Sequence, residues 1–128
     1  MKNNPINNIR FQPSLNHFNL ERMNKYLDND EFAIKEILLF VISDIKLSLT
    51  KLENCIYTKN IAQIGAISHN LFGTCATIGL EELSKIARLI ERETAFNEIV
   101  LSKLFKKLKA EIILVTDLMN NYIYNKSF

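Results

Sequence analysis

The C-terminal third of the chain carries the pattern that most restricts its fold. Seven apolar residues recur there at steps of four, three, four, three, four and three: Leu101, Phe105, Leu108, Ile112, Val115, Met119 and Tyr122. Side chains at this spacing lie along one stripe of an α-helix and form a narrow apolar seam. A seam needs other helices to remove it from water. The pattern therefore predicts a long helix, capped by Asn97, within a helical bundle.

Turn-forming residues are scarce in the rest of the chain. It has three glycines and two prolines in 128 residues, and both prolines lie among the first 13. A sheet-rich protein of this length would need more of them. Apolar residues instead recur at helical spacing in three further segments, which end near Tyr57, Gly79 and Thr94. We expect an all-α fold: an antiparallel up-down-up-down four-helix bundle with a short additional N-terminal helix at about 15–27.

Several residues mark the expected helix ends. Asp28 or Asp30 can cap the first long helix, and Asn60 can cap the next one. Gly79 stands where that second helix should end, in a position that favours a left-handed residue. The following helix is expected to run from about Leu80 to Thr94, after which the helix capped by Asn97 begins. Four helices with short connections follow from these signals.

Charge and composition exclude some classes of function. Lysine and arginine number 16 against 14 acidic residues, which gives a net charge of +2 without the basic excess of nucleic-acid-binding domains. The longest apolar run, 37–42, is too short to cross a bilayer, and the first residues lack a signal-peptide core. We therefore expect a cytoplasmic monomer that binds neither nucleic acid nor membrane. Its single domain would span 14–128, behind a flexible tail at 1–13.

His69 has an unusual neighbourhood on the helix that follows Asn60. On a helical wheel, the residues within roughly 60° of it, apart from Phe72 at the margin, are all alanine or glycine. We call this patch the clearing: Ala62, Gly65, Ala66, Gly73 and Ala76. Each glycine inside a helix costs roughly 1 kcal/mol relative to alanine, but small residues let another surface approach closely. The apolar face lies on the opposite side of the wheel, so His69 is expected to be exposed.

The residues around His69 indicate a simple chemical acceptor. An exposed imidazole can act as a nucleophile through its free nitrogen lone pair. No carboxylate or serine lies beside it at helical spacing, and His17, the only other histidine, has no ligand spacing to it, so we expect no metal site. Cys75 falls on the apolar side of the helix, where a buried thiol is expected. We therefore expect that the chain is not an enzyme acting alone and that a partner supplies the reaction machinery.

The segment His69-Asn70-Leu71-Phe72-Gly73, followed by Gly79, resembles the motif of histidine-containing phosphotransfer domains, His-x-x-Lys-Gly with a second glycine ten residues after the histidine. The downstream segment LEELSKIARLIERE is also similar to the family's next helix, and the resemblance covers about 30–123. It implies that His69 accepts a phosphoryl group from a receiver-domain phosphoaspartate, in a response regulator or hybrid kinase, and passes it to another receiver. The receiver would bring the Mg²⁺ and dock on the clearing, so no cofactor is expected on this chain.

One residue departs from the family motif. Phe72 stands where the family has a lysine, which is thought to lie near the phosphohistidine. The resemblance then implies that Lys85 or Arg88 on the next helix would supply the positive charge, and that Phe72 could add apolar docking area. Two alternatives stay open: a degenerate module that docks receivers without carrying phosphate, and a structural bundle that self-associates through its last helix.

Overall fold

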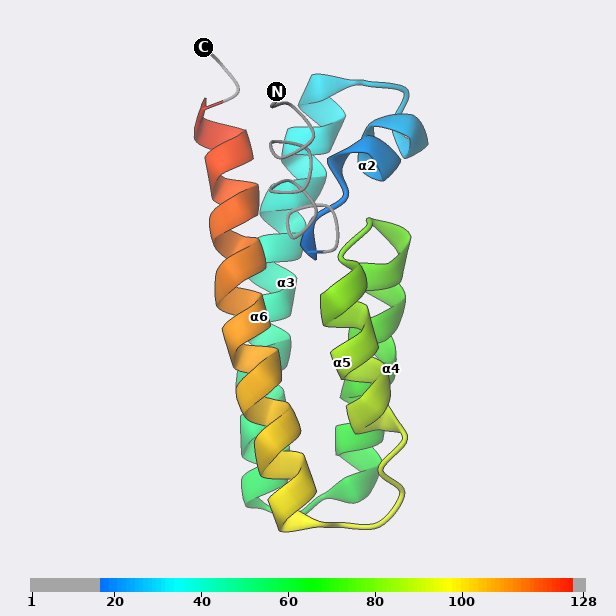
Figure 1. The fold of residues 1–128 in the computed structure, drawn as a ribbon, viewed down its shortest axis with the longest axis vertical. Helices are drawn as coiled ribbons and strands as arrows, with labels where there is room; N and C mark the ends of the chain where they lie inside the picture. Colours follow the sequence, from blue (N-terminus) through cyan, green and yellow to red (C-terminus); the bar gives the residue numbers. More distant parts are fainter. Residues whose placement is uncertain (1–16, 126–128) are drawn as a thin grey trace, which may run out of the picture.

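Helices make up the regular structure of this chain in the computed structural model, which describes residues 17–125 (Figure 1). No strand occurs within that range, so the all-α prediction is confirmed. In chain order the helices are α2 (Leu20–Tyr26), α3 (Glu31–Tyr57), α4 (Ile61–Thr77), α5 (Glu81–Glu91) and α6 (Glu98–Asn125). The tail predicted at 1–13 lies outside the described residues.

Polar side chains cap four of these helices. In each case the side-chain oxygen accepts a hydrogen bond of 3.0–3.2 Å from the backbone N–H three residues later; the capping residues are Asn19, Asp30, Asn60 and Asn97. The caps predicted at Asn60 and Asn97 are therefore confirmed. Of the two aspartates considered for α3, Asp30 is the cap, whereas Asp28 lies in the preceding turn with a φ of 53°.

Two helix boundaries differ from the sequence-based expectation. The N-terminal helix expected at about 15–27 is interrupted at residues 18 and 19, between a helical His17 and α2, which Asn19 caps and which begins at Leu20; residues 15 and 16 lie outside the described range. The helix expected to reach Thr94 ends at Glu91. Its last buried residue is Ile90, and Arg92 and Thr94 are exposed, so no apolar contact holds the chain in a helix beyond that point.

The helices α3, α4, α5 and α6 surround an apolar core as a helical bundle. Both α4 and α6 pack against α3 and α5, so each of the four has two neighbours (Figure 1). Five residues of the predicted α6 seam are buried and two are half-buried; the buried ones are Leu101, Leu108, Ile112, Val115 and Met119. Fully burying one large aliphatic side chain contributes roughly 1.5–3 kcal/mol, so the seam is a main source of stability.

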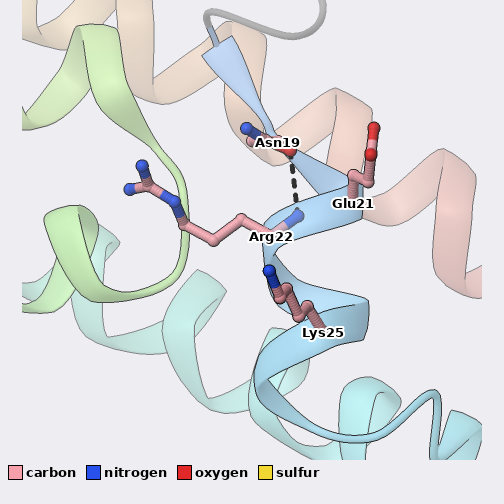
Figure 2. A pocket seen from close by; sticks show the side chains of 4 residues that line it. All are labelled: Asn19, Glu21, Arg22 and Lys25. Carbon is pink, nitrogen blue, oxygen red and sulfur yellow. Dashed lines mark hydrogen bonds between the residues drawn. The ribbon is translucent and has the colours of Figure 1, made fainter.

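The helix α2 is attached to the turn between α4 and α5. The backbone N–H of Asn19 donates to the Gly79 carbonyl at 2.9 Å. Arg22 reaches from α2 toward this turn (Figure 2), where Nη1 donates to the Ala76 carbonyl at 3.1 Å and Nη2 lies 3.6 Å from Oε1 of Glu81. Gly79 has a φ of 87°, the left-handed conformation predicted for the end of this helix. Arg22 thereby binds a carbonyl group in the last turn of α4, where such groups lack helical partners.

The residues just before α2 contact α6. Nδ1 of His17 pairs with Oε2 of Glu111, whose side chain is almost fully buried. The Phe18 ring meets the Tyr122 ring edge-on, with 6.4 Å between their centroids. A buried carboxylate is unfavourable unless it is paired, so His17 stabilises the position of Glu111 in the fold.

Candidate functional site

His69 lies in the middle of α4 with its side chain directed away from the core. The side chain is 65% exposed, whereas Ser68 and Leu71, close to it in the chain, are buried. The predicted exposure of the imidazole is therefore confirmed. The helical period explains it, since the apolar face that includes Ile64 and Cys75 occupies the other side of α4.

A carboxylate on the neighbouring helix contacts the imidazole. Nδ1 of His69 lies 2.8 Å from Oε2 of Glu91 on α5, 22 residues further along the chain. An ionised carboxylate can only accept a hydrogen bond, so Nδ1 carries the proton and donates it. In the uncharged ring the lone pair is then on Nε2, for which the described part of the chain offers no hydrogen-bond partner. The contact therefore leaves Nε2 as the ring nitrogen with an available lone pair.

Glu91 is more shielded from solvent than the ring it holds. Its side chain is 27% exposed, and Oε1 is buried without a hydrogen-bond partner in residues 17–125. A shielded carboxylate attracts a positive charge more strongly than one in open water, because the effective dielectric constant is lower. Glu91 is thus placed both to orient His69 and to stabilise any positive charge that develops on its ring.

A second contact joins the same two helices one turn away. Cζ of Arg88 lies 4.6 Å from the centroid of the Phe72 ring, in cation–π geometry. Phe72 follows His69 by three residues on α4, and Arg88 precedes Glu91 by three residues on α5. Going from the first contact to the second, the residue number rises by three on α4 and falls by three on α5, as in an antiparallel helix pair. They bring His69, Phe72, Arg88 and Glu91 together on one side of the bundle.

The clearing is open around both of its glycines. A Cβ atom on Gly65 or Gly73 would meet nothing beyond the adjoining backbone within 4 Å. Ala62 and Ala66 are exposed, while Ala76 is half-buried and its carbonyl accepts the hydrogen bond from Arg22. The five small residues thus form an accessible stretch of α4 around His69, bordered by α2 at the Ala76 end.

The two candidate cations on α5 have different surroundings. Arg88 contacts Phe72, next to His69. Lys85 instead lines a pocket of about 530 Å³ between α5 and α6, together with Lys107 and Glu111. The structure therefore brings Arg88, but not Lys85, to the group of residues around His69.

Cys75 is on the opposite side of α4 from His69 and is fully buried. Burial, and to a lesser extent the Asp44 carboxylate, raises the pKa of the Cys75 thiol from 9.0 to about 12. The thiol is consequently protonated at neutral pH and a poor nucleophile. Within residues 17–125, no three His, Cys, Asp or Glu residues gather as potential metal ligands.

The spacing of residues within α4 does not predict the contact with Glu91, because this carboxylate lies on the next helix. A signal was nevertheless present. His69 lies ten residues before Gly79 and Glu91 lies twelve residues after it. Two helices that fold back on each other at Gly79 bring residues at similar distances from the turn side by side, which would have indicated Glu91.

Comparisons of the chain with protein-family models, curated proteins and solved structures find no match. The resemblance to phosphotransfer domains therefore depends on the sequence motif and the segment that follows it. Over residues 17–125, no helix combines the length and the apolar character that crossing a membrane requires.

Proposed function

We propose that this chain is a histidine phosphotransfer protein: His69 accepts a phosphoryl group from the phosphoaspartate of a receiver domain and passes it to another receiver. The observation that carries the proposal is an exposed imidazole whose Nδ1 donates to Glu91 and whose Nε2 is free. The motif from His69 to Gly73, with Gly79 ten residues after the histidine, supports the same reading.

The transfer is a substitution at phosphorus. The Nε2 lone pair of His69 forms the new N–P bond while the bond between phosphorus and the aspartyl oxygen breaks, and the electron pair leaves with the receiver's carboxylate. The ring becomes positively charged, and Glu91 stabilises this charge through the Nδ1–H hydrogen bond. In the onward step the ring leaves with the electron pair of the N–P bond. Because such transition states need in-line placement and cations, we assign the Mg²⁺ to the receiver.

The clearing is the proposed docking site for receiver domains, since its small residues let another backbone approach His69 closely. We also propose that α3, α4, α5 and α6 form an antiparallel up-down-up-down four-helix bundle, which presents this face of α4 as a rigid surface. The partner supplies the catalytic groups, so the chain is a carrier and not an enzyme by itself. We expect it to act as a monomer in the cytoplasm.

A second candidate function is a module of the same kind that docks receivers without carrying phosphate. Phe72 favours it, because this residue replaces the lysine that the family places near the phosphohistidine. The free Nε2 of His69 favours the carrier, because pure docking does not require a nucleophilic nitrogen. The carrier is expected to take the phosphoryl group from a phosphorylated receiver, whereas the docking module is expected only to bind the receiver.

A transfer experiment tests the proposal. A panel of receiver domains is phosphorylated with acetyl phosphate and Mg²⁺, separated from the donor, and mixed with the chain. We expect acid-labile phosphate on His69, located by mass spectrometry, and none on His69→Gln. Transfer that persists in His69→Gln would refute the assignment of the site. Receiver binding by the wild-type chain without any transfer would support the docking module instead.

Changing Gly73 to alanine should raise the stability of the fold while it weakens receiver docking. The new methyl group meets no neighbour, and alanine is the better helix former, so we expect the free energy of unfolding to rise by about 0.5–1 kcal/mol. The same methyl group narrows the clearing, so transfer from a phosphorylated receiver should slow about tenfold. Urea unfolding and stopped-flow transfer measure the two effects. Unchanged receiver transfer in Gly73→Ala would argue against docking at the clearing.

A further inference from the structure

The guanidinium of Arg88 lies against the ring of Phe72, three residues from His69 on α4, and it has no acidic partner in the described part of the chain. It faces the Phe72 ring, and no carboxylate within residues 17–125 forms an ion pair with it. Contact with an aromatic face restrains a guanidinium but leaves its N–H donors, which point outward in the plane of the group, available. Arg88 therefore has charge and hydrogen-bonding capacity that the described part of the fold does not use.

The way α4 and α5 are aligned places the guanidinium of Arg88 close to the Nε2 side of His69. Phe72 is three residues from His69 on α4, and Arg88 is three residues from Glu91 on α5, which corresponds to about 4.5 Å along each helix axis. Arginine has a long side chain, and a phosphoryl group on Nε2 extends outward from the ring. Phe72 and Arg88 are half-buried, so a charge pair formed there is less screened than one in open solvent.

We propose that Arg88 is the phosphate-binding residue of this site: its guanidinium donates hydrogen bonds to the phosphoryl oxygens on phospho-His69, and Phe72 is the positioning residue that holds it. This inference rests on the proposed function of His69. A guanidinium suits the role because its fork of donors matches phosphate oxygens in pairs. The positive charge at this site is then supplied across the helix interface, from α5, by an arginine that the Phe72 ring supports.

Phosphoramidate allows the inference to be tested without a receiver. Nε2 of His69 forms the N–P bond while the P–N bond of phosphoramidate breaks, and the leaving nitrogen, already protonated, departs as ammonia with the electron pair. Loading of His69 is followed by mass spectrometry in the wild-type chain and in Arg88→Gln, Phe72→Leu and Lys85→Gln. Lys85→Gln is the matched control, since it removes one positive charge from the same helix on the side that faces α6.

We expect Arg88→Gln to load about tenfold more slowly, since a hydrogen bond to a charged group contributes enough to change a rate by at least this factor. Phe72→Leu keeps the charge but loses the ring, so its rate should fall about threefold. Lys85→Gln should load at the wild-type rate. In ¹H–¹⁵N spectra, one arginine Nε–H resonance should shift on loading, and this shift should be absent in Arg88→Gln.

The outcomes separate this inference from the proposed function. If His69 is loaded at the same rate in Arg88→Gln as in the wild-type chain, and no arginine resonance shifts, Arg88 does not bind the phosphoryl group, while the carrier function stands. If wild-type His69 is not loaded at all, by phosphoramidate or by any receiver, the carrier function itself is wrong. Equal slowing in Lys85→Gln and Arg88→Gln would show a general charge effect and would also overturn the specific role of Arg88.

Discussion

Replacing Glu91 by alanine is expected to slow phosphorylation of His69 by about 10- to 100-fold, because losing a group that orients a reactive imidazole has effects of this size or larger. Without the carboxylate, the ring can rotate and can place its proton on Nε2, the nitrogen that must attack. The positive charge that develops on the ring also loses its acceptor. The rate is measured by loading with phosphoramidate, so that docking does not affect the result.

Two variants control this experiment. Glu91→Gln keeps an oxygen that can accept from Nδ1 but loses the negative charge, so its rate should lie between those of the wild-type chain and Glu91→Ala. Glu82→Ala removes a carboxylate from the same helix on the side of the α5–α6 pocket and should have no effect. Wild-type loading in Glu91→Ala would mean that the 2.8 Å contact between Nδ1 and Oε2 does not prepare the ring for reaction.

Replacing Gly79 by alanine is expected to lower the free energy of unfolding by about 2–4 kcal/mol. A left-handed conformation costs a residue with a Cβ atom roughly 1–2 kcal/mol, and Gly79 has a φ of 87°. The new Cβ would also lie 3.0 Å from both Cβ and the carbonyl oxygen of Asn19. Relief of this crowding would move Asn19 and weaken its 2.9 Å hydrogen bond to the Gly79 carbonyl, a further loss of about 1 kcal/mol.

Urea unfolding measures the effect, with Gly73→Ala as the matched control. Both variants add one methyl group to α4 or its end, but Gly73 has open space and an ordinary helical conformation, so the two changes in stability should have opposite signs. Hydrogen exchange adds a local test, because weakening the Asn19 contact should expose the amides of α2. Equal stability of Gly79→Ala and the wild-type chain would contradict the role assigned to this turn.

Most of the fold was predictable because the apolar pattern and the capping residues are local features. The seam from Leu101 to Tyr122 and the caps at Asn60 and Asn97 are read directly from spacing, and each has the expected place in the structure. The choice between Asp28 and Asp30 depended on the path of the turn before α3, which spacing does not determine. The early end of α5 depended on where its contacts with the core stop.

The candidate site was predictable only where one helix determines it. The exposure of His69 and the open space at Gly65 and Gly73 follow from the period of α4 alone. The pairing with Glu91 and the choice between Lys85 and Arg88 depend on how α5 is rotated and shifted against α4. These are properties of two packed helices and the turn between them, and no helical wheel of either segment contains them.

The short connection between α4 and α5 has a consequence for how this chain can vary in length. Only residues 78–80 separate the two helices, whereas 92–97 separate α5 from α6. One inserted residue in 78–80 would change the tight turn at Gly79 that fixes how α5 is rotated and shifted against α4, and the contacts of Glu91 and Arg88 with α4 depend on that placement. Insertions and deletions that keep these contacts should therefore fall in the longer segment, and the length of the three-residue connection sets which residues of α5 lie opposite His69.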